Sequence, residues 1–136
     1  MPRPKTIPRG IRNNNPLNIR IGNTWLGEVA DPSDPSFEQF VTMQYGVRAA
    51  CVLLRRYIRH YKRTTIQAII AAWAPACENP TEVYINAVCR YMGMYPEDII
   101  KYEDKDTICR LIQAMCLVEN GQPISDDIIS KGYDMA

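Results

Sequence analysis

The chain has 136 residues and a formal net charge of +1, and 46% of its residues are apolar. That length suits one domain that buries a core without metal or disulfide support. The small net charge excludes recruitment of nucleic acid by an overall electrostatic field. Lys and Arg nevertheless predominate before about residue 68, and Asp and Glu predominate after it. The basic half either meets an anionic polymer or presents solvated helix faces.

The cysteines and the N-terminal residues narrow the class of protein further. The five cysteines form no CxxC pair, and the chain has one histidine. We therefore expect reduced core thiols, no metal and no cofactor. Residues 1–10 are basic and rich in proline, and no apolar segment follows them. They predict a flexible basic arm and no secretory signal, and the lack of a long apolar run predicts no membrane insertion.

The first elements in chain order are turns, followed by helices. Residues 11–44 carry Asn, Gly, Pro, Asp and Ser between short apolar segments, which predicts a β-hairpin with its tip near residues 22–23. Over residues 46–62 apolar side chains recur at three- and four-residue steps, opposite a basic face. This spacing predicts an amphipathic helix. Thr64 or Thr65 can cap a second helix that ends near Trp73.

The second half of the chain is predicted to be helical throughout. An N-cap at Asn79, with Pro80 after it, begins a helix that runs to about residue 92 and stops at Gly93. A further helix begins at residue 104 or 106 and ends at residues 120–121. Ser125 caps a last short helix.

Glu119 is placed unusually within the helix that precedes residue 120. It continues the apolar stripe of that helix, four residues after Met115. Burial and the negative end of the helix dipole both disfavour the carboxylate anion, so we expect a raised pKa. A carboxylic acid that keeps its proton near neutral pH can protonate the leaving oxygen of a glycosidic bond. The alternative is that Glu119 lies at the edge of the stripe and reaches water.

Short motifs around this helix carry a resemblance to a known family. Residues 13–20, NNNPLNIR, resemble the NNxFGIK segment of bacterial β-N-acetylglucosaminidases of the lysozyme-like superfamily, and residues 25–27, WLG, stand where that family has Trp-x-Gly. Residues 78–84, ENPTEVY, are similar to its YATDxxY element. Residues 111–121 resemble its catalytic helix, but they follow the predicted hairpin instead of preceding it. The order therefore resembles a circular permutation, which neighbouring chain ends make easy.

The pattern RGIRNNNP with a late ENGQ also resembles small phage and prophage structural or virion proteins, over nearly the whole chain. Together the resemblances imply a mainly α, lysozyme-like helical bundle with a small β-hairpin lobe near the N-terminus. Residues 1–10 form the arm, and residues 11–136 form one lysozyme-like domain. The implied function is cleavage of peptidoglycan glycan strands as a muramidase, glucosaminidase or lytic transglycosylase, with Glu119 as the acid. The alternative is a non-catalytic structural or adaptor protein of a phage virion or injection device.

The resemblance also implies which residues bind the substrate. Asn14, Asn15 and Asn18 would line the cleft beside the hairpin, where their amides can pair with sugar hydroxyl and N-acetyl groups. Trp25 would stack on a sugar face or seal the small lobe. Tyr84, which matches the final Tyr of the family element, would steady charge at the sugar ring or simply pack.

No second carboxylate stands out, and Glu78, beside the predicted Asn79 cap, is the first candidate. Other candidates lie on the hairpin side, at Glu28, Asp31 and Glu38. One Glu suffices if the substrate's own N-acetyl group or 6-hydroxyl supplies the nucleophile.

The resemblance implies a protein made in the bacterial cytoplasm that acts in the periplasm or cell wall. Delivery would come from phage lysis, a virion or a secretion system, so partners include phage-particle or secretion-apparatus components as well as glycan strands. The basic, aromatic stretch over residues 55–63 suits nucleic acid. Its tyrosines lie near the apolar side at helical spacing, however, so we do not expect nucleic acid as a partner.

Overall fold

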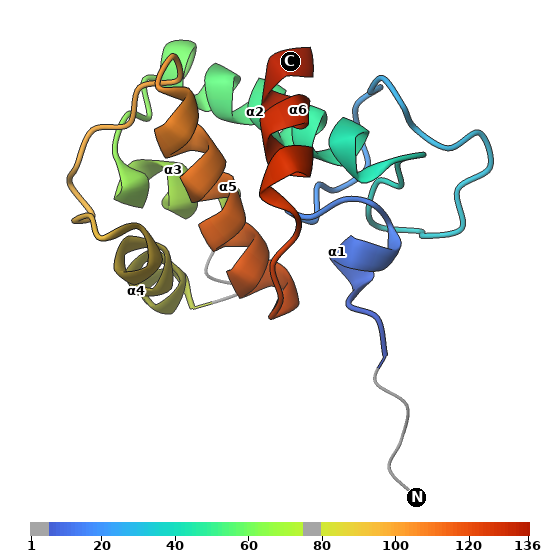
Figure 1. Ribbon diagram of the computed structural model, residues 1–136, viewed down its shortest axis with the longest axis horizontal. Coiled ribbons are helices and arrows are strands. Elements are labelled where there is room, and N and C mark those ends of the chain that lie inside the picture. The colour runs from blue at the N-terminus through green and yellow to red at the C-terminus, as the bar shows by residue number, and fades with distance from the viewer. Residues whose placement is uncertain (1–5, 75–79) are drawn as a thin grey trace, which may run out of the picture.

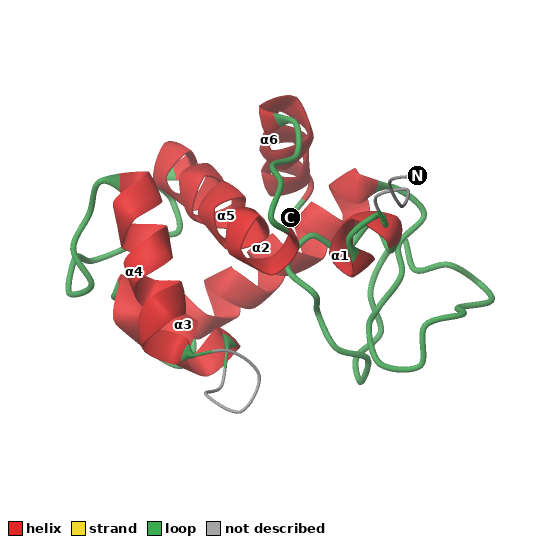
Figure 2. Cartoon of the chain, turned by 90° about the horizontal axis from the view of Figure 1, so that it is seen from below, coloured by secondary structure: helices red, strands yellow, loops and turns green. Residues whose placement is uncertain are grey.

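The computed structural model describes residues 6–74 and 80–136 of the chain. Across these residues it contains six helices and no strand longer than an isolated bridge (Figures 1 and 2). The mainly α class predicted from the sequence is confirmed. The helices are α1 (Arg9–Arg12), α2 (Met43–Arg59), α3 (Ile66–Trp73), α4 (Thr81–Met92), α5 (Lys105–Asn120) and α6 (Asp126–Met135).

The core forms where α2 and α5 meet the shorter helices. α2 packs mainly against α6, and α5 contacts both α4 and α6. The predicted apolar stripes face inward, and the side chains of Leu54, Leu111 and Met115 are fully buried. None of the helices in the described part of the chain is long and apolar enough to cross a membrane.

Local capping explains where most of these helices begin and end. The Thr65 side chain accepts a hydrogen bond from the backbone of α3, and Asp104 does the same for α5. Gly93 and Gly121 end α4 and α5 in the left-handed conformation that glycine adopts without strain. The predicted Asn79 cap lies outside the described residues. Ser125 stands at the N-cap position of α6, but its side chain makes no capping hydrogen bond there.

The small lobe differs from the predicted hairpin. Arg20 bridges Phe37 and Glu28 bridges Phe40, both antiparallel, so the partner of each segment comes from residues 36–41 and not from across residues 22–23. The backbone amide of Glu38 donates to Ile19 O at 2.9 Å. The predicted hairpin with its tip at residues 22–23 is therefore wrong. Residues 36–41 form the backbone hydrogen bonds with both earlier segments, and the chain between those segments is an irregular loop (Figure 1).

The predicted arm is shorter than residues 1–10. α1 begins at Arg9, and Gly10 within it is buried. The Arg9 guanidinium forms an ion pair with Asp34 at 2.6 Å, which ties α1 to the small lobe. Of the arm, residues 1–5 lie outside the described residues. The four cysteines that the structure describes are free thiols, and three of them are buried.

Candidate functional site

The carboxyl group of Glu119 lies in the last turn of α5 and receives hydrogen bonds from two distant parts of the chain. Asn18 Nδ2 donates to Glu119 Oε1 at 2.9 Å. The Tyr84 hydroxyl, on α4, donates to Glu119 Oε2 at 3.0 Å. Glu119 itself is partly buried. The structure therefore brings together three of the residues predicted from the sequence, and both donors are neutral groups that fix the orientation of the carboxyl.

Asn18 reaches Glu119 because the turn before it is held in an unusual backbone conformation. Asn18 has a φ of +52°, in the left-handed region that Asn tolerates better than most residues. Its backbone amide donates to Asn15 O at 3.1 Å. The neighbour of Glu119, Asn120, donates from Nδ2 to Pro16 O at 2.8 Å. The end of α5 thus binds the turn twice, once through the carboxyl and once through the amide beside it.

Gly10 on α1 packs directly against this junction. A Cβ built on Gly10 would lie 2.4 Å from Asn120 Oδ1, 2.8 Å from Asn15 O and 2.9 Å from Asn18 Oδ1. Real Cβ atoms essentially never approach other heavy atoms this closely, so only glycine fits without displacing its neighbours. The Asn18 and Asn120 side-chain oxygens are buried, and neither has a hydrogen-bond donor among residues 6–74 and 80–136. The α1 backbone therefore fixes the positions of both asparagine side chains beside Glu119.

Tyr84 is a buried hydrogen-bond donor in this site. Its residue is 1% exposed. Burial, together with the negative charge of Glu119, raises the pKa of Tyr84 well above its ordinary value. The phenol therefore stays protonated at any working pH and always offers its hydrogen to the carboxyl.

The structure places the other predicted binding residues within the lobe itself. The Asn15 side chain is fully buried, where it donates to Ile19 O and Glu38 O and accepts from the Ile19 amide. Asn14 donates from Nδ2 to Phe40 O at 3.0 Å. Trp25 is 8% exposed and belongs to the core. In the structure these three side chains hold or seal the lobe, and their contact with a ligand stays a prediction.

The candidates for a second carboxylate are spread across the described and undescribed parts of the chain. Glu78 lies outside the described residues, and Asp31 is exposed. Glu38 is buried beside Glu28, and burial followed by the hydrogen bond and charge of Glu28 raises the pKa of Glu38 to about 8. Glu38 thus holds a proton at neutral pH within the small lobe.

A groove of about 280 Å³ has Asn18, the residue that donates to Glu119, in its lining. Its lining includes Asn18, Asn23, Tyr57 and Trp73. Trp73 donates from Nε1 to Leu17 O at 3.2 Å, and its ring meets the Tyr57 ring edge-on at 5.6 Å. Trp73 packs against the core while presenting part of its surface to this groove. Trp73 lies four residues after the buried Ile69, so helical spacing predicts burial for both and does not reveal the groove.

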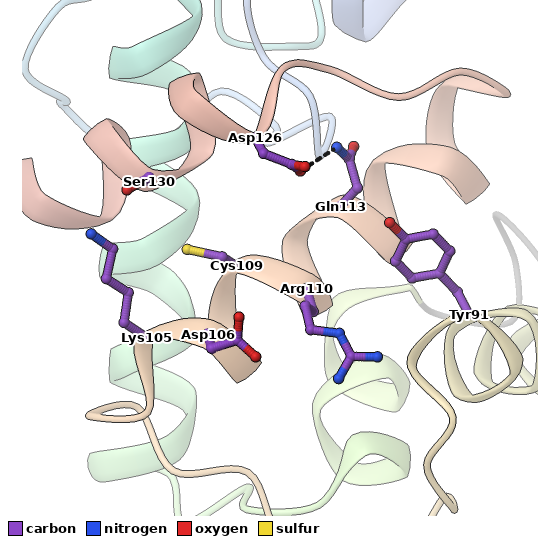
Figure 3. Close-up of a pocket in the computed structure, with 8 residues that line it drawn as sticks. All are labelled: Tyr91, Lys105, Asp106, Cys109, Arg110, Gln113, Asp126 and Ser130. Carbon is purple, nitrogen blue, oxygen red and sulfur yellow. Dashed lines mark hydrogen bonds between the residues drawn. The ribbon is translucent and has the colours of Figure 1, made fainter.

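A larger pocket, of about 550 Å³, lies where α4, α5 and α6 meet (Figure 3). The sequence singled out none of its lining residues. Three of its polar side chains are used within the protein: Lys105 pairs with Asp134, Arg110 donates to Met92 O, and the Gln113 amide bonds residue 124 and Asp126. The Gln113 side chain therefore holds α6 against α5. We propose no ligand or reaction for this pocket.

The fold and the site define a small, mainly helical protein with a carboxyl group held at a helix end by an asparagine and a tyrosine. No protein-family model matches the chain. The chain is 43% identical over 131 residues to Protein P5 of Pseudoalteromonas phage PM2, an alignment that covers 93% of this chain and 80% of the relative. The chain therefore belongs to the family of this phage protein.

This relationship confirms the predicted resemblance to phage proteins. The match to this phage protein shows no membership of the lysozyme-like superfamily. It favours the phage-protein alternative more directly than it favours a glycosidase.

Proposed function

We propose that the Glu119 site binds peptidoglycan glycan strands and that Glu119 is the acid that cleaves them. One observation carries the proposal: a carboxyl group at a helix end is held in a single orientation by Asn18 and Tyr84, which the fold brings from elsewhere in the chain. Removing a carboxyl group from water costs free energy unless it is hydrogen-bonded, and such costs are common at functional sites.

In the proposed reaction Glu119 donates its proton to the oxygen between two aminosugars, and the bond from that oxygen to C1 breaks. The N-acetyl oxygen or the C6 hydroxyl of the same sugar attacks C1. If the hydroxyl attacks, the Glu119 carboxylate takes up the hydroxyl proton, and the product is a 1,6-anhydro sugar. If the N-acetyl oxygen attacks, an oxazolinium ring forms; water then attacks C1, the Glu119 carboxylate takes up one water proton, the bond from C1 to the N-acetyl oxygen breaks, and the product has a reducing end. No cofactor is required by either route.

The neighbouring residues have distinct roles in this proposal. Tyr84, which stays protonated, donates to Glu119 Oε2 and leaves Oε1 to Asn18. The groove that Asn18 lines supplies an amide from Asn23 and the exposed part of the Trp73 ring. Amides pair with hydroxyl and N-acetyl groups, and aromatic rings cover the apolar face of a sugar.

Release of dye from dye-labelled, purified sacculi tests the proposal. The wild type is expected to release dye, and Glu119→Gln, which keeps the size of the side chain but has no carboxyl proton to donate, is expected to release none. Glu82→Gln is the matched control, because Glu82 is an exposed glutamate on α4. If Glu82→Gln lost dye release as completely as Glu119→Gln, and circular dichroism showed that both variants are folded, the role of Glu119 would be contradicted.

A second candidate function is supported by the relationship to a phage protein. In this candidate the protein is a non-catalytic component of a phage particle or injection device, and the Glu119 network is structural. The family relationship supports this candidate more directly than the catalytic one. The wild type would then release no dye, while Glu119→Gln would lower stability, and antibodies against the chain would detect it in purified particles.

A further inference from the structure

Two loops lie together at the end of the molecule farthest from the small lobe (Figure 1). The loop after α2 and the loop before α5 pair through an antiparallel bridge between Thr65 and Ile99. The amide of Ile100 donates to Thr64 O at 2.7 Å, and the amide of Ile66 donates to Asp98 O at 3.3 Å. The backbones of the two loops therefore brace each other, and we call the two loops together the platform.

This platform exposes three large apolar side chains. Tyr61 is 57% exposed, Tyr95 is 70% exposed and Ile99 is 65% exposed. Nothing in the proposed function uses them. The sequence had suggested that Tyr61 lies on the apolar side of a helix, but α2 ends at Arg59 and Lys62 turns the chain with a φ of +56°. Tyr61 therefore projects into solvent.

The same platform is rich in cations. Lys62, Arg63 and Lys101 are all exposed. In residues 55–63 and 95–103 together, Lys and Arg outnumber Asp and Glu six to three. One cation and one carboxylate of this set, Arg59 and Glu103, pair with each other at 3.2 Å, which leaves five cations and two carboxylates.

We propose that this surface, made of Tyr61, Lys62, Arg63, Tyr95, Ile99 and Lys101, docks the protein onto an anionic phospholipid bilayer. Tyrosine rings and an isoleucine side chain suit the boundary between lipid headgroups and acyl chains, where apolar surface leaves water. Lysine and arginine beside them meet the lipid phosphates. An exposed isoleucine adds nothing to phosphate binding or base stacking, so the combination fits a bilayer better than nucleic acid.

The docking surface is separate from the Glu119 site. α5 begins beside the surface at Lys105 and ends at Asn120, a length of about 24 Å for its 16 residues. Docking at one end of α5 therefore leaves Glu119 at the other end accessible. The inference does not rest on the proposed function, and either can fail without the other.

Cosedimentation of the full chain with vesicles tests the inference. We expect binding to vesicles of phosphatidylglycerol and phosphatidylethanolamine, weaker binding at higher salt, and little binding to phosphatidylcholine vesicles. Lys62→Gln should lower the partition coefficient by about fivefold, the effect of one cation near such a surface. Ile99→Ser should lower it several-fold through lost apolar burial.

Matched controls come from elsewhere on the molecule. Lys131→Gln removes an exposed cation from α6, and Val83→Ser removes an apolar side chain from α4 that is exposed to the same 65% as Ile99. Neither control should change binding. Equal losses in the controls, equal binding to both kinds of vesicle, or binding of single-stranded DNA without binding of vesicles would overturn the inference.

Discussion

Replacing Gly10 with alanine perturbs the Glu119 site without changing Glu119 or either of its hydrogen-bond donors, Asn18 and Tyr84. The added methyl group would lie 2.4 Å from Asn120 Oδ1 and 2.8 Å from Asn15 O. The asparagine side chain can rotate away, but the backbone oxygen cannot move without shifting the turn. Asn18 is part of that turn, so its hydrogen bond to Glu119 should lengthen or break.

The cost in stability follows from two opposing effects. Overpacking by one methyl group costs about 1–3 kcal/mol, while alanine is favoured over glycine within a helix by up to about 1 kcal/mol. We expect the free energy of unfolding of Gly10→Ala to fall by about 1–2 kcal/mol. For a chain of this size that loss lowers the Tm by roughly 4–8 °C.

Gly93→Ala separates the effect on the site from the effect on stability. Gly93 ends α4 with a φ of +66°, and nothing lies within 4 Å of its added methyl group. Left-handed alanine costs about 1–2 kcal/mol, so the two variants should lose similar stability. Thermal unfolding monitored by circular dichroism measures that loss.

The side-chain amide signals of Asn18 and Asn120 in a ¹⁵N-correlated NMR spectrum report on the site. They should shift in Gly10→Ala and stay in place in Gly93→Ala. Unchanged amide signals in Gly10→Ala, or the same shifts in both variants, would refute the reasoning that α1 positions these side chains.

Three further predictions follow from the same contacts. Tyr84→Phe removes the donor to Glu119 Oε2 but keeps the ring, so it should slow sacculus cleavage by about tenfold while costing about 1 kcal/mol of stability; an unchanged rate would remove Tyr84 from the site. Glu38→Gln should flatten the pH dependence of stability. Folded Glu38, with a pKa of about 8 against an ordinary 4.5, keeps a proton that the unfolded chain releases, so wild-type stability should fall as pH rises between those values. Parallel denaturation profiles for the two proteins would contradict this assignment. Asn15→Ala leaves buried backbone groups without partners and should cost about 3 kcal/mol in urea denaturation, whereas the exposed Asn86→Ala should cost almost nothing.

The helices could be predicted well from the sequence because their signals are local. Thr65, Asp104, Gly93 and Gly121 each mark a helix end through chemistry that depends only on nearby residues. The continuation of the apolar stripe to Glu119 also depended only on helical spacing. The position of Glu119 at the end of α5 was therefore predictable.

The small lobe could not be predicted in the same way, since its pairing joins residues far apart in the sequence. The bridge between Arg20 and Phe37 spans a long loop, and no local signal distinguishes it from a tight hairpin at residues 22–23. α1 was missed because its four residues show no periodicity, and Gly10 is conspicuous only once Asn15 and Asn120 are seen against it.

The roles of the asparagines illustrate the same limit. The sequence grouped Asn14, Asn15 and Asn18 as cleft residues because they share a motif. In the structure Asn14 and Asn15 bond backbone groups of the lobe, and Asn18 alone of the three reaches Glu119. The backbone dihedral angles of the turn decide which of these three side-chain amides faces the end of α5. Tertiary contacts with α1 and α5 set those angles.

Mass analysis of the soluble products from purified sacculi, incubated with the wild type and with Glu119→Gln, tests the proposed role of Glu119 most directly. We predict that the wild type alone releases muropeptides, and that their reducing or 1,6-anhydro ends identify the route of cleavage. Release of the same products by both proteins would keep the enzyme but exclude Glu119 as its acid. No release by either protein, with both folded, would contradict glycan cleavage and leave the structural phage component as the function of this chain.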